Sequence, residues 1–287
     1  MMRWIRRHIL PAYAFLAFCY LMLPIAVVIL FSFNAPSGRY NYVWEGFTFD
    51  NWLNWDAVPG IKDAVITSLE IGIISTVAAT ILGTMLALAI VRHQFRGRGA
   101  TNMLIFLPMS TPEIVLGASL LTLFLNMRIF TGFGTIFIAH VMFIVSYVVV
   151  TVKARLIDFD RHLEEAAMDL GAGPFTTFRK ITLPLLAPAI LSAALLGFAL
   201  SIDDFVITYF VAGSTTTFPL FVWGAARVSV PPQVNVVASA IFMVAVLIMI
   251  GNVLWGLRTR RRGDDAAAAE PLAIAIPEPL ARPEPAS

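Results

Sequence analysis

The sequence has 287 residues, of which 59% are hydrophobic, and its formal net charge at neutral pH is only +2. The mean hydropathy of +0.81 is far higher than a soluble globular domain needs, so the composition indicates a membrane protein. The small net charge gives no reason to expect a nucleic-acid partner. Cys19 is the single cysteine, which excludes a disulfide within the chain.

Several segments are long and apolar enough to cross a bilayer, which takes about 20 mostly apolar residues in a helix. We count six: residues 9–33, 63–91, 101–126, 134–152, 185–212 and 234–257. The first apolar run is longer than that of a cleavable signal peptide, so we expect it to be retained. The sequence therefore predicts an all-α membrane protein with six transmembrane helices.

The distribution of Lys and Arg predicts the orientation of these helices, because basic residues concentrate in cytoplasmic connections. One set of connections holds 15 basic residues: Arg3, Arg6, Arg7, Arg92, Arg96, Arg98, Lys153, Arg155, Arg161, Arg179, Lys180, Arg258, Arg260, Arg261 and Arg262. The opposite set holds four: Arg39, Lys62, Arg128 and Arg227. We therefore expect both termini to be cytoplasmic.

The longest connection on the opposite side, residues 34–61, is rich in aromatic residues. Tyr and Trp favour the membrane–water interface, so a belt at the bilayer surface is one interpretation. A docking surface for an external partner is the other. Both interpretations stay open at this stage.

Four carboxylates fall inside the predicted spans, namely Glu70, Glu113, Asp203 and Asp204. A charge at a helix centre costs about 2.5–3.5 kcal/mol on insertion scales, so such residues face a cavity or a partner. No basic residue is predicted at the same depth, and an acidic pathway would attract cations. Of the two aspartates we favour Asp204, which shares a helix face with Thr208, for the path, and expect the other to bond within the protein.

Two other features concern these carboxylates. Pro108 and Pro112 precede Glu113, and a proline kink exposes backbone carbonyls that are tolerated beside a cavity. The competing interpretation is that all four acids simply hydrogen-bond to Ser, Thr or Tyr on neighbouring helices. His140 is expected to be an interhelical hydrogen-bond partner more than a proton relay.

A polar stretch between the fourth and fifth predicted spans carries a distinctive pattern. Its defining residues are Glu165, Ala166, Ala167, Gly171, Ile181, Leu183 and Pro184. The first part has apolar residues at helical spacing, and Gly171 and Gly173 then break the helix. Pro174 suits the first turn of a second helix. The pattern predicts a compact helix–turn–helix projection.

This spacing resembles the cytoplasmic "EAA" loop of permease subunits of ATP-binding-cassette (ABC) importers. The resemblance implies that residues 1–260 form a type-1 transmembrane domain and that Glu165–Gly171 is a helix coupling it to an ATPase. It also implies a prokaryotic inner-membrane location. The expected partners are a homologous permease, two copies of a cytoplasmic ATPase that bind ATP and Mg²⁺, an external substrate-binding protein and the lipid bilayer.

Within these importers the chain is similar to the second permease subunit of spermidine/putrescine systems. The residues that carry this match are 109–115, 149–152, 200–204 and 228–235. The resemblance implies a polyamine substrate, and other cationic or small organic solutes remain alternatives. Residues 261–287, rich in Pro and Ala, are expected to be a disordered tail.

Other classes of function find less support in the sequence. It has no G-x-x-x-x-G-K-[ST] phosphate loop and no Cys/His cluster, so we expect neither ATP hydrolysis, nor a metal site, nor a cofactor in this chain. An intramembrane enzyme would have to rely on Glu113 and His140. A cation channel or ion-coupled carrier would explain the intramembrane acids but not the EAA-like loop.

Overall fold

The computed structural model describes residues 2–38 and 40–268 and divides them into two units. Residues 33–234 form one unit, and residues up to 32 together with those from 235 form the other. The first unit contains, in chain order, α2 (Asp50–Leu53), α3 (Ile61–Arg92), α4 (Arg98–Ser110), α5 (Glu113–Asn126), α6 (Phe133–Ile157), α7 (His162–Asp169), α8 (Pro174–Thr177), η1 (Phe178–Thr182), α9 (Leu183–Asp203), α10 (Val206–Val211) and α11 (Phe218–Ala226).

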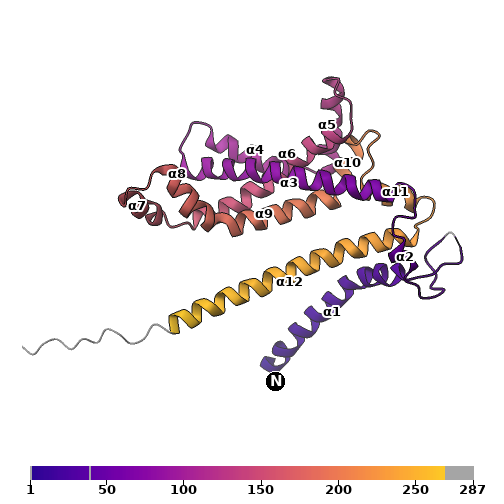
Figure 1. Ribbon diagram of the computed structural model, residues 1–287. Coiled ribbons are helices and arrows are strands. Elements are labelled where there is room, and N and C mark those ends of the chain that lie inside the picture. The colour runs from indigo at the N-terminus through magenta and orange to yellow at the C-terminus, as the bar shows by residue number, and fades with distance from the viewer. Residues whose placement is uncertain (1, 39, 269–287) are drawn as a thin grey trace, which may run out of the picture. The chain divides into compact units, whose positions relative to one another are not determined.

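The core of this unit lies among α3, α6 and α9, which pack side by side (Figure 1). Small residues let the helices approach closely, as is common in membrane proteins. A Cβ atom at Gly83 would lie 2.6 Å from a Val148 methyl, and one at Gly197 would lie 2.5 Å from an Ile144 methyl. Glycine is therefore required where α3 and α9 each cross α6.

Long apolar helices confirm that the chain is a helical membrane protein. Within the part of the chain that the structure describes, four helical segments meet the length and hydropathy of a span: Ile9–Ser32, Ile61–Arg92, Phe133–Ile157 and Pro174–Asp203. The pair α4 and α5 would be a fifth if it counts as one span. α12 spans Pro232–Ala268, but its apolar segment, Pro232–Ile248, is shorter than these four. The count of six spans remains a prediction.

Two predicted spans are interrupted. Residues 101–126 form two helices bent by 108°, with the break at Thr111–Pro112. Proline removes a backbone donor and forces the preceding residue out of the helical region, and Thr111 has ψ 132°. The span 185–212 ends as α9 at Asp203 and resumes as α10 at Val206. The expectation of one continuous helix there is wrong.

The second unit contains α1 (Met2–Ser32) and most of α12. Apolar side chains of α1 are largely exposed, with Leu10 at 74% and Leu23 at 59%. An apolar helix of this kind needs lipid or another protein around it. The predicted domain boundary at residue 260 lies inside α12, which continues to Ala268, and residues 269–287 of the predicted tail lie outside the described residues.

The aromatic connection is an ordered structure built around Asn34. The buried side-chain amide of Asn34 donates to Oδ1 of Asn41 and to the carbonyl of Val43, each at 2.7 Å, and its Oδ1 accepts from the N–H of Glu45 at 2.9 Å. Beside it, the ring of Phe33 stacks on Trp52 and Phe47. This arrangement holds several exposed aromatic rings in fixed positions, and both interpretations of the connection remain open.

Candidate functional site

The loop that carries the EAA-like pattern has the predicted helix–turn–helix form. α7 ends at Asp169, and Gly171 adopts a left-handed conformation with φ +87°. The N–H of Gly171 bonds to the carbonyl of Met168, and that of Ala172 to the carbonyl of Ala167. A left-handed residue after a helix is commonly glycine, since it has no Cβ to clash. Pro174 then opens α8.

The pattern residues of this loop lie mainly at the surface. Glu165, Ala166, Gly171, Leu183 and Pro184 are exposed, and Ala167 and Ile181 are half-buried. Large apolar side chains are also exposed beside them, above all Leu170 at 91% and Phe175 at 73%. Exposed apolar residues grouped on a short, ordered loop are typical of a protein-docking surface.

Three residues that the sequence did not single out hold this loop in place. The Glu164 carboxylate accepts a hydrogen bond from the Arg92 guanidinium at 2.5 Å and another from the Thr182 hydroxyl. Arg92 and Glu164 are 72 positions apart, so no local sequence signal pairs them. By contrast, Glu165 forms an exposed contact with His162 at 3.2 Å.

The four predicted path acids fall into two groups. Glu70, Glu113 and Asp203 are exposed, whereas Asp204 is buried. α5 and α10 pack closely, since a Cβ at Gly117 would lie 2.6 Å from the Phe210 ring. This packing sets α5, which begins at Glu113, against α10, which begins three residues after Asp203.

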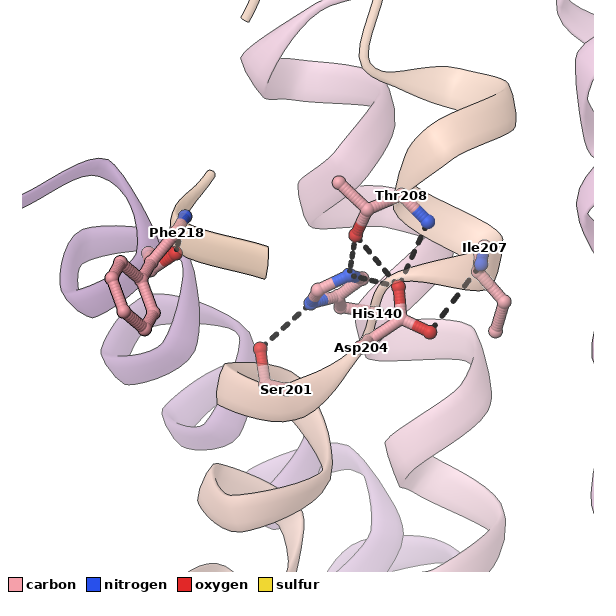
Figure 2. Close-up of polar contacts among 7 residues, drawn as sticks. His140, Ser201, Asp204, Ile207, Thr208 and Phe218 are labelled. Carbon is pink, nitrogen blue, oxygen red and sulfur yellow. Dashed lines mark hydrogen bonds and ion pairs between the residues drawn. The ribbon is translucent and has the colours of Figure 1, made fainter. Parts of the chain in front are cut away.

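Asp204 belongs to a buried polar cluster with His140, Ser201 and Thr208, shown in Figure 2. Its Oδ2 accepts from the Thr208 hydroxyl at 2.6 Å and from the Thr208 N–H at 2.8 Å, and it lies 3.3 Å from Nε2 of His140. The ring also contacts Thr208 Oγ1 at 2.9 Å and, through Nδ1, Ser201 Oγ at 2.7 Å.

The contacts of Thr208 fix which group donates at Nε2 of His140. Thr208 donates its hydroxyl proton to Asp204, so its oxygen must accept from Nε2–H of His140. Nδ1 of His140 shares a hydrogen bond with the Ser201 hydroxyl. His140 thus joins α6 to α9 and α10, which confirms its expected role as an interhelical hydrogen-bond partner.

This placement changes the preference between the two aspartates. Asp204 and Thr208 do come together, as their spacing predicts. The Asp204 carboxylate nevertheless lies at the break between α9 and α10. Its oxygens accept hydrogen bonds from backbone N–H groups in the first turn of α10. The internal role therefore falls to Asp204, and Asp203 is the exposed candidate for the path.

The chain matches the model of a protein family described as "Binding-protein-dependent transport system inner membrane component" over residues 79–263. The chain belongs to this family of transport permeases. This confirms the resemblance drawn from the EAA-like loop. It also supports, at the level of the family, a multi-pass membrane protein.

Individual permeases match most of the chain. It is 38% identical to the spermidine/putrescine transport system permease protein PotC of Haemophilus influenzae, over 83% of this chain and 93% of that one. It is 39% identical to the putrescine transport system permease protein PotI of Escherichia coli K12, over 85% and 89% of the two chains.

Solved structures with the same fold are more distant in sequence. A bacterial ABC transporter that imports alginate has a TM-score of 0.60 at 15% identity, covering 91% of this chain and 98% of that one. The MetNI methionine ABC transporter has a TM-score of 0.54 at 16% identity, covering 69% and 94%. These likenesses show the ABC permease fold alone.

Proposed function

We propose that this permease is one subunit of an ATP-driven ABC importer for the polyamines spermidine and putrescine. The observation that carries the proposal is the similarity to PotC and PotI over more than four fifths of the chain. The chain's own chemistry agrees with a cationic substrate, because Glu70, Glu113 and Asp203 are exposed carboxylates in apolar helices.

The proposed assembly contains a second, homologous permease, two copies of an ATPase and an external binding protein. An exposed apolar surface supports a partner at the loop: Leu170 and Phe175 on the α7–α8 loop are largely exposed. ATP and Mg²⁺ would be bound by the ATPase, whose closure supplies the force for transport. This chain would then hydrolyse no ATP.

The proposed topology has six transmembrane helices, with both termini and the α7–η1 loop in the cytoplasm. The charge bias supports it, because 15 basic residues lie in the connections assigned to that side and four in the others. Four of the predicted spans correspond to helices of sufficient length and a fifth to the bent pair α4 and α5, and we assign the sixth to α12, whose apolar segment Pro232–Ile248 is shorter. An alkaline phosphatase or fluorescent-protein fusion series would test each connection.

In the proposed mechanism, acidic side chains carry a polycation through the permease. Asp203 and Glu113 are exposed carboxylates at the end of α9 and the start of α5, and a flexible polyamine with separated ammonium groups would pair with both. Asp204 acts differently: it holds the α9–α10 break with His140, which fixes where Asp203 projects. Movement of α7 by the ATPase would expose this acidic path to each side in turn.

Uptake by reconstituted vesicles tests the proposal. The complete transporter should accumulate radiolabelled spermidine or putrescine under two conditions only. ATP must be present on the side of the membrane where the ATPase is bound, and the binding protein must be present on the other side. Uptake of another cation or small organic solute under the same conditions would retain the importer and change the substrate. Uptake driven by an ion gradient without ATP would instead support an ion-coupled carrier.

A further inference from the structure

Two adjacent glutamates on α7 have opposite surroundings. Glu165, part of the EAA-like pattern, is 61% exposed and lies against His162, which is 88% exposed. The Glu164 side chain is only 13% exposed. Since successive residues on a helix point about 100° apart, Glu165 faces outward while Glu164 faces the body of the protein.

The inward glutamate connects three elements through one oxygen atom. Oε1 of Glu164 accepts from Nη2 of Arg92 at 2.5 Å and from Oγ1 of Thr182. Arg92 is in the last turn of α3, where a cation also interacts favourably with the helix dipole. Thr182 is fully buried and directly precedes α9. We call Arg92, Glu164 and Thr182 the latch.

The latch restrains an element that is otherwise attached by short connections. Residues 158–161 lead from α6 into α7, and residues 170–173, including the left-handed Gly171, lead out of it. Among the described residues a second bond also reaches α3, from Arg161 Nη2 to the Val91 carbonyl, but it is exposed and 3.4 Å long. α7 also packs against α8 and η1, but the latch is its one side-chain ion pair to α3 among the described residues.

The two helices that meet at the latch lead to the transport site. α3 packs along α6 and α9, and α9 ends at Asp203, beside the buried Asp204–His140 pair. Charge-assisted hydrogen bonds are the stronger ones, and a partly buried pair is screened less than an exposed one. The latch is therefore a stiff connection between the loop surface and the acidic end of α9.

We propose that Glu164 is the positioning residue through which displacement of α7 reaches α3 and α9. The inference rests on the proposed importer function, in which an ATPase moves α7. It assigns the outward Glu165 side of α7 to the partner and the inward Glu164 side to transmission. Loss of the latch should then leave ATP hydrolysis in place and weaken its coupling to uptake.

The experiment compares variants of the complete transporter in vesicles, measuring spermidine imported per ATP hydrolysed. Glu164→Ala and Arg92→Gln should each lower this ratio at least fivefold. Glu164→Gln, which keeps acceptor geometry but loses the charge, should fall between them and the unaltered protein. Arg96→Gln is the matched control, because it removes a basic residue from an exposed position in the same connection. Its ratio should be unchanged.

An exchange of the two charges, Arg92→Glu with Glu164→Arg, gives the decisive comparison. The exchanged protein should recover at least half of the lost ratio, since the ion pair is rebuilt in reverse; recovery is incomplete because a carboxylate at position 92 opposes the dipole at the C-terminal end of α3. An unchanged ratio in both Glu164→Ala and Arg92→Gln would overturn the inference. So would failure of the exchanged protein to insert or to couple, because the pair would then serve folding alone.

This outcome is separable from failure of the proposed function. If the unaltered transporter shows no ATP-dependent spermidine or putrescine uptake, the polyamine assignment fails. The latch is then tested by the ratio of basal ATP hydrolysis to hydrolysis stimulated by the external binding protein. Glu164→Ala should reduce the stimulation at least fivefold, and unchanged stimulation would again overturn the inference.

Discussion

Nε2 of His140 lies 3.3 Å from Oδ2 of Asp204, and both side chains are almost completely buried. The contact joins the first third of α6 to the break between α9 and α10. Because Asp204 also receives two backbone N–H groups of α10, the cluster fixes an interrupted helix that would otherwise expose unpaired backbone groups. Its first role is therefore to hold this break.

We expect His140→Ala to destabilise the folded protein by about 1–3 kcal/mol, because Ser201 and Asp204 each lose a buried hydrogen-bond partner. The melting temperature of the detergent-solubilised protein should fall accordingly. His140→Gln, which can replace one of these hydrogen bonds, should lower it less. His93→Ala, at an exposed position, is the control and should have no effect. Equal melting temperatures for all variants would contradict the structural role of the cluster.

Asp203→Asn should leave the stability of the protein nearly unchanged and should weaken transport. The side chain is exposed, so removing its charge should change the free energy of unfolding by less than about 0.5 kcal/mol. If Asp203 contacts the substrate, the KM for spermidine uptake should rise about tenfold, equivalent to about 1.4 kcal/mol of binding. Asp204→Asn should instead lower the melting temperature. A normal KM in Asp203→Asn would remove this residue from the path.

Gly171 offers a test of the loop geometry. Gly171→Ala places a Cβ at φ +87°, where an L-residue costs about 1–2 kcal/mol. The end of α7 should distort, and co-purification of the ATPase should decrease. Gly173→Ala is the matched control, because Gly173 has φ −69° and no atom within 4 Å of the added Cβ. Equal ATPase recovery from both variants would disprove the requirement for a left-handed turn.

The features that the sequence predicts well are those set by local chemistry. Apolar runs define the long helices, and the glycines and Pro174 define the turn between α7 and α8. Pro112 also predicts an interruption in the third span, although not its angle of 108°. Each of these depends on residues within a few positions of one another.

The features that it misses depend on tertiary contacts. No Gly or Pro lies between Phe198 and Ala212, so the helical pattern extends through Asp204. The break is stabilised by His140, 64 positions earlier. Helical spacing therefore assigned Asp204 to the path. In the sequence, Arg92 contributes only to the charge bias that predicts the orientation of the helices. In the structure, its guanidinium forms an ion pair with Glu164.

The aromatic connection should respond to pH through Glu45. Hydrogen bonds from the side chain and backbone N–H of Ser37 hold the pKa of this carboxyl below its ordinary value. A lowered folded-state pKa gives stabilisation that is present above the unfolded pKa and is lost as the pH falls through the folded one. We therefore expect the fluorescence of Trp44 and Trp52 to change at acidic pH, below the usual range for glutamate.

Glu45→Gln tests this assignment, because an amide does not titrate. The variant should lose the acidic transition in tryptophan fluorescence, whereas Asp56→Asn, in the same aromatic connection, should retain it. A transition that persists unchanged in Glu45→Gln would assign the pH response to a different group.

The contact between Gly197 and Ile144 gives the sharpest test of helix packing. A Cβ at Gly197 would lie 2.5 Å from Cγ2 of Ile144, a branched side chain with little freedom to move away. Gly197→Ala should therefore cost about 1–3 kcal/mol by overpacking, measured as a lower melting temperature. Because Asp203 is the last residue of α9, displacement of this helix should also lower the rate of spermidine uptake by the variant.

Removing the opposing methyl group should relieve this clash. The double variant Gly197→Ala/Ile144→Ala should be more stable than the sum of the two single changes predicts, since contacting residues are not additive. Gly224→Ala is the control, because no atom lies within 4 Å of its added Cβ. Strict additivity in the double variant would mean that α6 and α9 do not meet at these residues. The position of Asp203 would then not depend on this contact.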